Sequence, residues 1–139
     1  MKTFLVLAVS IVLVSILCCP ISMAAPPMPD GLQIVQPDPS LPKELSAFWG
    51  KWEGATGMVQ YFLIIEKIDE KQASLWVWKS GGTPLHPQGW NRYEARVFKV
   101  RGEYKLGYRD PFGNTGLALK GEYLDYANKG GNPRLTRVP

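Results

Sequence analysis

The sequence predicts an all-β fold: an antiparallel up-and-down meander of about eight short strands that closes into a small barrel, preceded by a short helical turn. Three observations carry this prediction. Short stretches rich in β-branched and aromatic residues recur along the chain. The connections between them are too short for crossover helices, so neighbouring strands should pair antiparallel. Downstream of the helical turn, no stretch has the apolar period of a helix.

Residues 1–24 are expected to be a secretory signal peptide that precedes the fold. Lys2 supplies a positive charge, and an apolar run follows from Phe4 to Leu17. This run of about 14 residues is short of the roughly 20 that a spanning helix needs. Small residues then surround a cleavage point after Ala24. We therefore expect a secreted or periplasmic protein without a stable membrane span after processing; an uncleaved anchor is the alternative.

Both cysteines, Cys18 and Cys19, lie inside this predicted signal peptide. The mature chain would therefore have no disulfide. A lipid anchor on one of these cysteines is a further alternative. The residue before each cysteine argues against it, because lipoprotein processing prefers a small Gly, Ala or Ser there, whereas Leu17 precedes Cys18.

Residues 25–42 form a proline-rich leader, and residues 43–139 form the barrel domain. Prolines at positions 26, 27, 29, 37, 39 and 42 exclude regular helix or central strand, so the leader should be extended and partly disordered. Ser40 is expected to cap a short helix or 3₁₀ turn that reaches Phe48, with Leu45 and Phe48 on its apolar side.

The first strand begins near Gly50, and the later strands are expected at 58–68, 73–79, 90–100, 103–109, 116–120, 122–127 and 135–138. Turns are expected between them, at 69–71, 101–102, 110–114 and 128–133 among others. In the third strand Trp76 and Trp78 share one face, opposite Leu75 and Val77. In the fourth strand Tyr93 lies on the face opposite Arg92, Glu94 and Arg96. The sequence does not show which of these faces points inward.

The start and the end of the chain resemble known barrels. Gly50-x-Trp52 on a first strand, after a short helical turn, is similar to the start of calycin-superfamily barrels such as lipocalins and avidins. The resemblance implies that a basic residue from the last strand covers Trp52 and closes the barrel, and Arg134 and Arg137 are the candidates. A cation over an indole contributes about 0.5–2 kcal/mol.

Residues 41–138 also resemble a group of bacterial secreted domains of unassigned function, which run from L-P-x-E-L…G-x-W-E-G to R-L-x-R-V. The other lipocalin loop signatures and the avidin set of ligand residues do not occur in this sequence. The resemblance therefore carries over the packing role of Trp52 and says nothing about a ligand.

Composition and motifs argue against catalysis and nucleic-acid binding. Of 16 basic residues Lys2 falls in the signal peptide, which leaves 15 against 12 acids, and these are not clustered. His86 is the only histidine, so neither a metal site nor a cofactor is expected. No G-x-S-x-G is present, and no pair of carboxylates is singled out among Glu53, Glu66, Glu94, Glu122 and Asp125. We therefore do not expect an enzyme.

The aromatic residues carry the functional hypothesis. The chain has 5 Trp and 6 Tyr, which would either fill a barrel core or line a cavity. The first hypothesis is non-covalent binding of a small hydrophobic or amphipathic molecule, with Trp76, Trp78 and Tyr93 as lining. Arg92 and Arg96 would suit an anionic head group if their face pointed inward. The alternative is a filled-core accessory or protein-interaction domain at the cell envelope. An apolar cavity of about 300 Å³ would favour the first hypothesis, and a filled interior the second.

Overall fold

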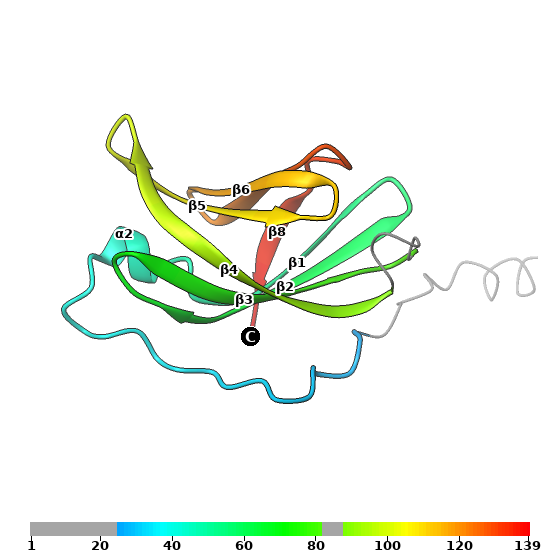
Figure 1. Cartoon of the computed structure of the whole chain (residues 1–139), viewed down its shortest axis with the longest axis horizontal. Helices are drawn as coiled ribbons and strands as arrows, with labels where there is room; N and C mark the ends of the chain where they lie inside the picture. Colours follow the sequence, from blue (N-terminus) through cyan, green and yellow to red (C-terminus); the bar gives the residue numbers. More distant parts are fainter. Residues whose placement is uncertain (1–24, 82–87) are drawn as a thin grey trace, which may run out of the picture.

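The computed structural model describes residues 25–81 and 88–139 (Figure 1). The predicted signal peptide with Cys18 and Cys19, and the His86 loop, lie outside the described residues. Within the described ranges, the structure has no helix with the length and apolar character needed to cross a membrane.

Eight strands pair in sequence order and close into one barrel, as predicted (Figure 1). All neighbouring pairs are antiparallel, including the seam between the first and the last strand. The elements are α2 (Lys43–Ser46), β1 (Gly50–Thr56), β2 (Val59–Ile68), β3 (Gln72–Lys79), β4 (Gly89–Val100), β5 (Glu103–Asp110), β6 (Gly113–Lys120), β7 (Tyr123–Ala127) and β8 (Arg134–Val138).

Most predicted strand bounds are within a residue or two of those observed, but the turn predicted at 110–114 is wrong in length. Asp110 pairs directly with Gly113, so the connection between β5 and β6 is the two residues Pro111 and Phe112. Gly113 has a φ of 128°, a conformation that glycine adopts without the steric cost of a side chain. Both strands thus extend into residues whose composition is typical of a loop.

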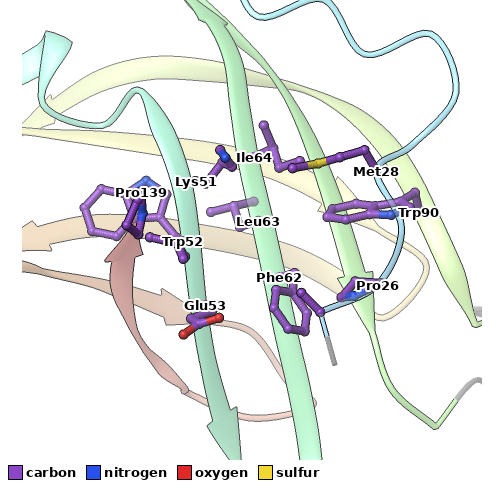
Figure 2. A pocket seen from close by; sticks show the side chains of 12 residues that line it. Pro26, Met28, Lys51, Trp52, Glu53, Phe62, Leu63, Ile64, Trp90 and Pro139 are labelled. Atoms are coloured by element: carbon purple, nitrogen blue, oxygen red, sulfur yellow. The ribbon is translucent and has the colours of Figure 1, made fainter. Parts of the chain in front are cut away.

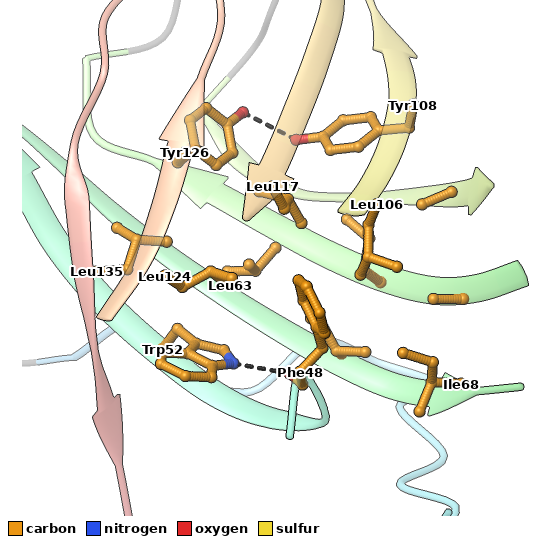
Figure 3. Packing of buried hydrophobic residues seen from close by; sticks show 14 of the residues in the cluster. Phe48, Trp52, Leu63, Ile68, Leu106, Tyr108, Leu117, Leu124, Tyr126 and Leu135 are labelled. Carbon is orange, nitrogen blue, oxygen red and sulfur yellow. Dashed lines mark hydrogen bonds between the residues drawn. The ribbon is translucent and has the colours of Figure 1, made fainter. Parts of the chain in front are cut away.

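Side chains that alternate inward along the strands fill the barrel with one apolar cluster (Figure 3). Full burial of an aliphatic or aromatic side chain contributes about 1.5–3 kcal/mol each, so this cluster is the main source of stability. Its most deeply buried members are Leu45, Phe48, Trp52, Leu63, Ile65, Leu75, Val77, Leu106, Leu117, Leu124, Tyr126 and Leu135.

The segment around α2 plugs one end of the barrel. Leu45 and Phe48 are buried, as predicted, and the indole Nε1 of Trp52 donates to the carbonyl oxygen of Phe48 at 2.9 Å (Figure 3). The prediction that Ser40 caps this helix is wrong. Pro42 occupies the N-cap position without a side-chain hydrogen bond. The Ser40 hydroxyl instead donates to Asp38 at 2.7 Å, and the helix begins two residues later than predicted.

The barrel closes as the calycin resemblance implies, with Arg137 as the basic residue. Its guanidinium carbon lies 4.3 Å from the centre of the Trp52 ring, and its nitrogens donate to the carbonyl oxygens of Trp49 and Ala47. Gly50 makes room for it, since a Cβ on Gly50 would lie 2.7 Å from Nη1 of Arg137. Arg134 instead lies over Tyr123, outside this closure.

The leader, residues 25–42, crosses the outside of the barrel along β2, β3 and β4 (Figure 1). The backbone N–H of Val35 donates to the carbonyl oxygen of Glu66 at 2.7 Å, and Trp90 Nε1 donates to the carbonyl oxygen of Pro27 at 2.7 Å. Although it has no regular secondary structure, the leader is therefore bonded to the barrel wall at two separated points.

Candidate functional site at the open end of the barrel

The residues that the sequence singled out for ligand binding lie on both sides of the barrel wall. Tyr93 points inward and packs against the core, whereas Trp76 and Trp78 point outward, because Leu75 and Val77 on the same strand face the core. Arg92 and Arg96 also point outward from β4. The structure therefore does not bring these five residues into one site.

Two of the four outward-facing residues, Trp76 and Arg92, are joined by one buried carboxylate, Glu66. Its side chain accepts hydrogen bonds from Trp76 Nε1 at 2.9 Å and from Arg92 Nε at 2.8 Å and Nη2 at 2.6 Å. Burial alone would raise the pKa of Glu66, but the bonds from Trp76 and Arg92 and from the backbone of Gln33 together lower it. Trp78 packs edge-on against Phe62 with ring centres 5.5 Å apart, away from this cluster.

A polar cluster that the sequence analysis missed lies inside the barrel, at the end opposite α2. The β1–β2, β5–β6 and β7–β8 connections, the end of β3 and the start of β4 surround this end. Lys79, at the end of β3, continues the inward alternation of Leu75 and Val77 and extends into the barrel mouth. Its Nζ lies 3.6 Å from Oδ2 of Asp110, which is almost fully buried.

Aromatic rings surround the Lys79 ammonium. Its Nζ lies 5.4 Å from the ring centres of Tyr61 and Tyr126 and 5.5 Å from that of Phe112. Each ring presents its negative face to a cation, which stabilises the charge where water is scarce. Burial lowers the pKa of Lys79, and the Asp110 carboxylate partly offsets this shift.

Asp110 is held by donors other than Lys79. Its carboxylate accepts hydrogen bonds from the Phe112 backbone N–H at 2.9 Å, the Thr115 hydroxyl at 3.1 Å and the Asn128 amide at 3.4 Å. These three donors satisfy the oxygens of the Asp110 carboxylate without Lys79. The ammonium of Lys79 therefore keeps hydrogen-bonding capacity that Asp110 does not use.

Tyrosines form the floor between this cluster and the apolar core. The hydroxyls of Tyr108 and Tyr126 are 2.8 Å apart and share one hydrogen bond (Figure 3). The rings of Tyr93 and Tyr108 lie 4.8 Å apart. Burial raises the pKa of both hydrogen-bonded tyrosines, so they remain neutral at physiological pH.

Above the floor is a small pocket of about 160 Å³, lined by Val59, Tyr61, Lys79, Ser80, Gly81, Phe112 and Gly130. Below it the packed side chains of the core occupy the interior down to Phe48 and Trp52 (Figure 3). Among the described residues, no three His, Cys, Asp or Glu side chains come together as potential metal ligands.

A signal for the mouth cluster was present in the sequence. Lys79 is in phase with Ala73, Leu75 and Val77, so a lysine follows an apolar stripe inward. The outward-facing cluster also had a signal, since Glu66 interrupts the apolar stretch of β2. Asp110 had no such signal, because the composition of residues 110–114 predicts a turn there.

Comparison of the chain with models of known protein families, with curated proteins and with solved structures finds no match. The closed antiparallel barrel of eight strands is compatible with a calycin-like fold. The class is thus defined by architecture alone: a small all-β barrel, plugged at one end and carrying a polar cluster at the other.

Proposed function

We propose that this protein is a secreted or periplasmic, non-enzymatic binding protein of calycin type, which holds one end of a small amphipathic molecule in the barrel mouth. One observation carries the proposal: the Lys79 ammonium lies beneath a pocket whose other walls are largely aromatic or apolar. Small-molecule sites typically have apolar walls with a small number of precisely placed polar groups.

The chemistry of the mouth favours a head group with hydrogen-bond acceptors. An ammonium has three N–H donors and no acceptor. Asp110 is already bonded to Thr115 and to the Phe112 backbone, so a carboxylate or carbonyl oxygen of a ligand can share Lys79 without stranding Asp110. A ligand ammonium would meet Lys79 as a like charge, which is unfavourable in a partly buried site.

The volume sets the size of the bound part. About 160 Å³ is close to the size of an engineered cavity that admits benzene, and below the 300 Å³ or more of a typical ligand pocket. The packed interior leaves no room for a deeper ligand. We therefore expect the head and a short apolar stem to enter, with Phe112 and Val59 against the stem and the rest of the ligand outside.

The proposal is tested by NMR titration of the mature chain with three six-carbon probes: hexanoate, hexanol and hexylamine. We expect signals of the mouth residues to shift, with hexanoate binding best and hexylamine worst. Lys79→Met should weaken hexanoate binding at least tenfold and remove its advantage over hexanol. Lys71→Met, at the exposed β2–β3 turn, is the matched control and should bind like wild type. Equal binding by the Lys79 and Lys71 variants would refute the proposal.

The packed interior favours a second candidate, the filled-core accessory domain that acts through its surface. Native mass spectrometry of the mature protein, purified from the envelope fraction of its own cells, separates the two candidates. A retained small molecule supports the first, and its mass narrows the ligand class. A clean apo mass, together with no response to the six-carbon probes, favours the second.

A further inference from the structure

The outward face of β2, β3 and β4 carries the leader in a way that points to peptide recognition. We call this face the outer wall; it is formed by Phe62, Ile64, Glu66, Trp76, Trp90 and Arg92. The contacts between leader and wall are made largely by the leader's backbone. This feature is independent of the barrel mouth and of any ligand bound there.

Glu66 is the centre of the outer wall because the β2 ladder is irregular at this residue. The pairing of β2 with β3 shifts register between Ile65 and Lys67. The carbonyl oxygen of Glu66 accepts the backbone N–H of Val35 at 2.7 Å, and its carboxylate accepts that of Gln33 at 3.2 Å. One residue thus binds two alternate amides of an extended peptide, whatever side chains that peptide carries.

Trp90 supplies the second contact, at the proline-rich part of the leader. Its indole Nε1 donates to the carbonyl oxygen of Pro27 at 2.7 Å, and Pro26 and Met28 lie beside the ring (Figure 2). An indole that donates to the carbonyl of a proline-rich segment, with an apolar surface next to it, is how extended proline-rich peptides are commonly recognised.

The leader does not fill all the space next to the outer wall. A groove of about 180 Å³ remains between Pro26 and Met28 on the leader and Phe62, Ile64 and Trp90 on the wall (Figure 2). On its other side it is lined by residues of β1 and of the C-terminal segment: Lys51, Trp52, Glu53, Val138 and Pro139. On the leader itself, Met28, Ile34 and Val35 are 55%, 48% and 46% exposed. The groove is therefore open space beside the leader, which a side chain of another peptide could fill.

Charge on the outer wall does not oppose such a peptide. Arg92 neutralises Glu66 through two hydrogen bonds, and Glu94 lies 3.8 Å from the same guanidinium. The Glu66–Arg92 pair that the leader contacts is therefore neutral, which suits an uncharged peptide, and Glu94 adds one negative charge beside it. The leader supplies this chemistry: residues 31–37 contain no charged side chain.

From these contacts we propose that the outer wall is a binding site for an extended, proline-containing peptide of a partner protein, and that the leader occupies this site in cis. A partner binds by displacing the leader. Because the leader is tethered, its effective concentration is of millimolar order, so a competing segment binds poorly until the leader is loosened. The partner side chain next to Trp90 fills the groove that Met28 leaves open.

The test uses the whole mature chain and, as the probe, a fluorescein-labelled synthetic peptide of residues 25–40, followed by fluorescence anisotropy. In Q33P/V35P both leader amides that bind Glu66 are removed. We expect this variant to bind the probe at least tenfold more tightly than wild type. I34P is the matched control: it adds a proline at a position whose N–H has no partner among the described residues, and should behave closer to wild type.

Two further arms locate the binding. In the first, Trp90→Phe is added to Q33P/V35P; this removes the bond to Pro27 and should weaken binding of the probe at least tenfold. In the second, the probe peptide itself carries Q33P and V35P, and it should bind to the Q33P/V35P protein at least tenfold more weakly than the unmodified probe. If Q33P/V35P is folded by circular dichroism and does not bind the probe, the proposal is overturned. If it does not fold, wild type is titrated to millimolar probe by NMR. Unchanged indole signals of Trp90 and Trp76 would then overturn the proposal.

Discussion

Replacement of Gly50 by alanine tests the closure of the barrel. Gly50 has a φ of 118°, and a Cβ there would lie 2.7 Å from Nη1 of Arg137. The backbone strain of a non-glycine residue in such a conformation costs about 1–3 kcal/mol. The methyl group also displaces the guanidinium from Trp52, a contact that contributes about 0.5–1 kcal/mol at an exposed site. Its bonds to the carbonyls of Trp49 and Ala47 add about 0.5–1.5 kcal/mol each.

Taken together, G50A should lower the free energy of unfolding by about 2.5–7 kcal/mol, a large share of the 5–15 kcal/mol of a typical domain. The assay is urea unfolding followed by tryptophan fluorescence. With an m-value of about 1.5 kcal/mol/M, the midpoint should fall by about 2 M or more.

The matched control for G50A is G57A. Gly57 has a φ of 57° and nothing within 4 Å of the added Cβ, so this change measures the backbone cost alone, about 1–2 kcal/mol. The excess loss in G50A should disappear in an R137M background, where there is no guanidinium to displace. If G50A costs within about 0.5 kcal/mol of G57A, the packing of Arg137 against Gly50 does not stabilise the barrel, and the reasoning is wrong.

Two pH dependences follow from buried groups. Burial raises the pKa of Tyr108 and Tyr126, so the unfolded chain loses protons above about pH 10 that the native chain retains, and stability should fall as pH rises from about 10.5 to 11.5. The midpoint of urea unfolding should fall with pH over this range, and Tyr108→Phe should make the fall smaller. A midpoint that does not change with pH would contradict the burial of these two tyrosines. Glu66 has a lowered pKa, so its stabilising effect is present above its unfolded value of 4.5 and is lost as pH falls through the lower native value. The Gln33 amide signal should move over that acid range in wild type and stay fixed in E66Q; the same titration in both would exclude Glu66 as the leader's anchor.

The sequence was sufficient for the architecture because local rules determine it. Alternation and turn residues located the strands, and their short connections dictated antiparallel neighbours. The closure was predicted from Trp52 and the last strand, where the geometry selects Arg137 over Arg134. The strands and turns have signals within a few residues along the chain, whereas the closure was expected from the resemblance to calycin barrels.

The candidate site was less predictable because it depends on which face of each strand points inward. In β3 both faces are apolar, so the sequence allowed either Trp76 and Trp78 or Leu75 and Val77 to point into the barrel. The contacts that hold the two tryptophans outside, Trp76 with Glu66 and Trp78 with Phe62, are made with another strand, and no local pattern encodes them. Lys79 and Asp110 lie on different strands, β3 and β5, and only the register of the folded barrel brings them together.

The seam between β1 and β8 has a consequence for when the barrel can form. Arg137 reaches back over 88 residues to the carbonyl of Trp49, and β8 pairs with both β1 and β7. Contacts of such long sequence separation slow folding, because the chain must close a large loop before they form. A chain that emerges from a ribosome N-terminus first cannot complete its ring of hydrogen bonds until β8 is free to pair with β1 and β7. The earlier strands must therefore wait, with the edges of β1 and β7 unpaired, for the strand that closes the barrel.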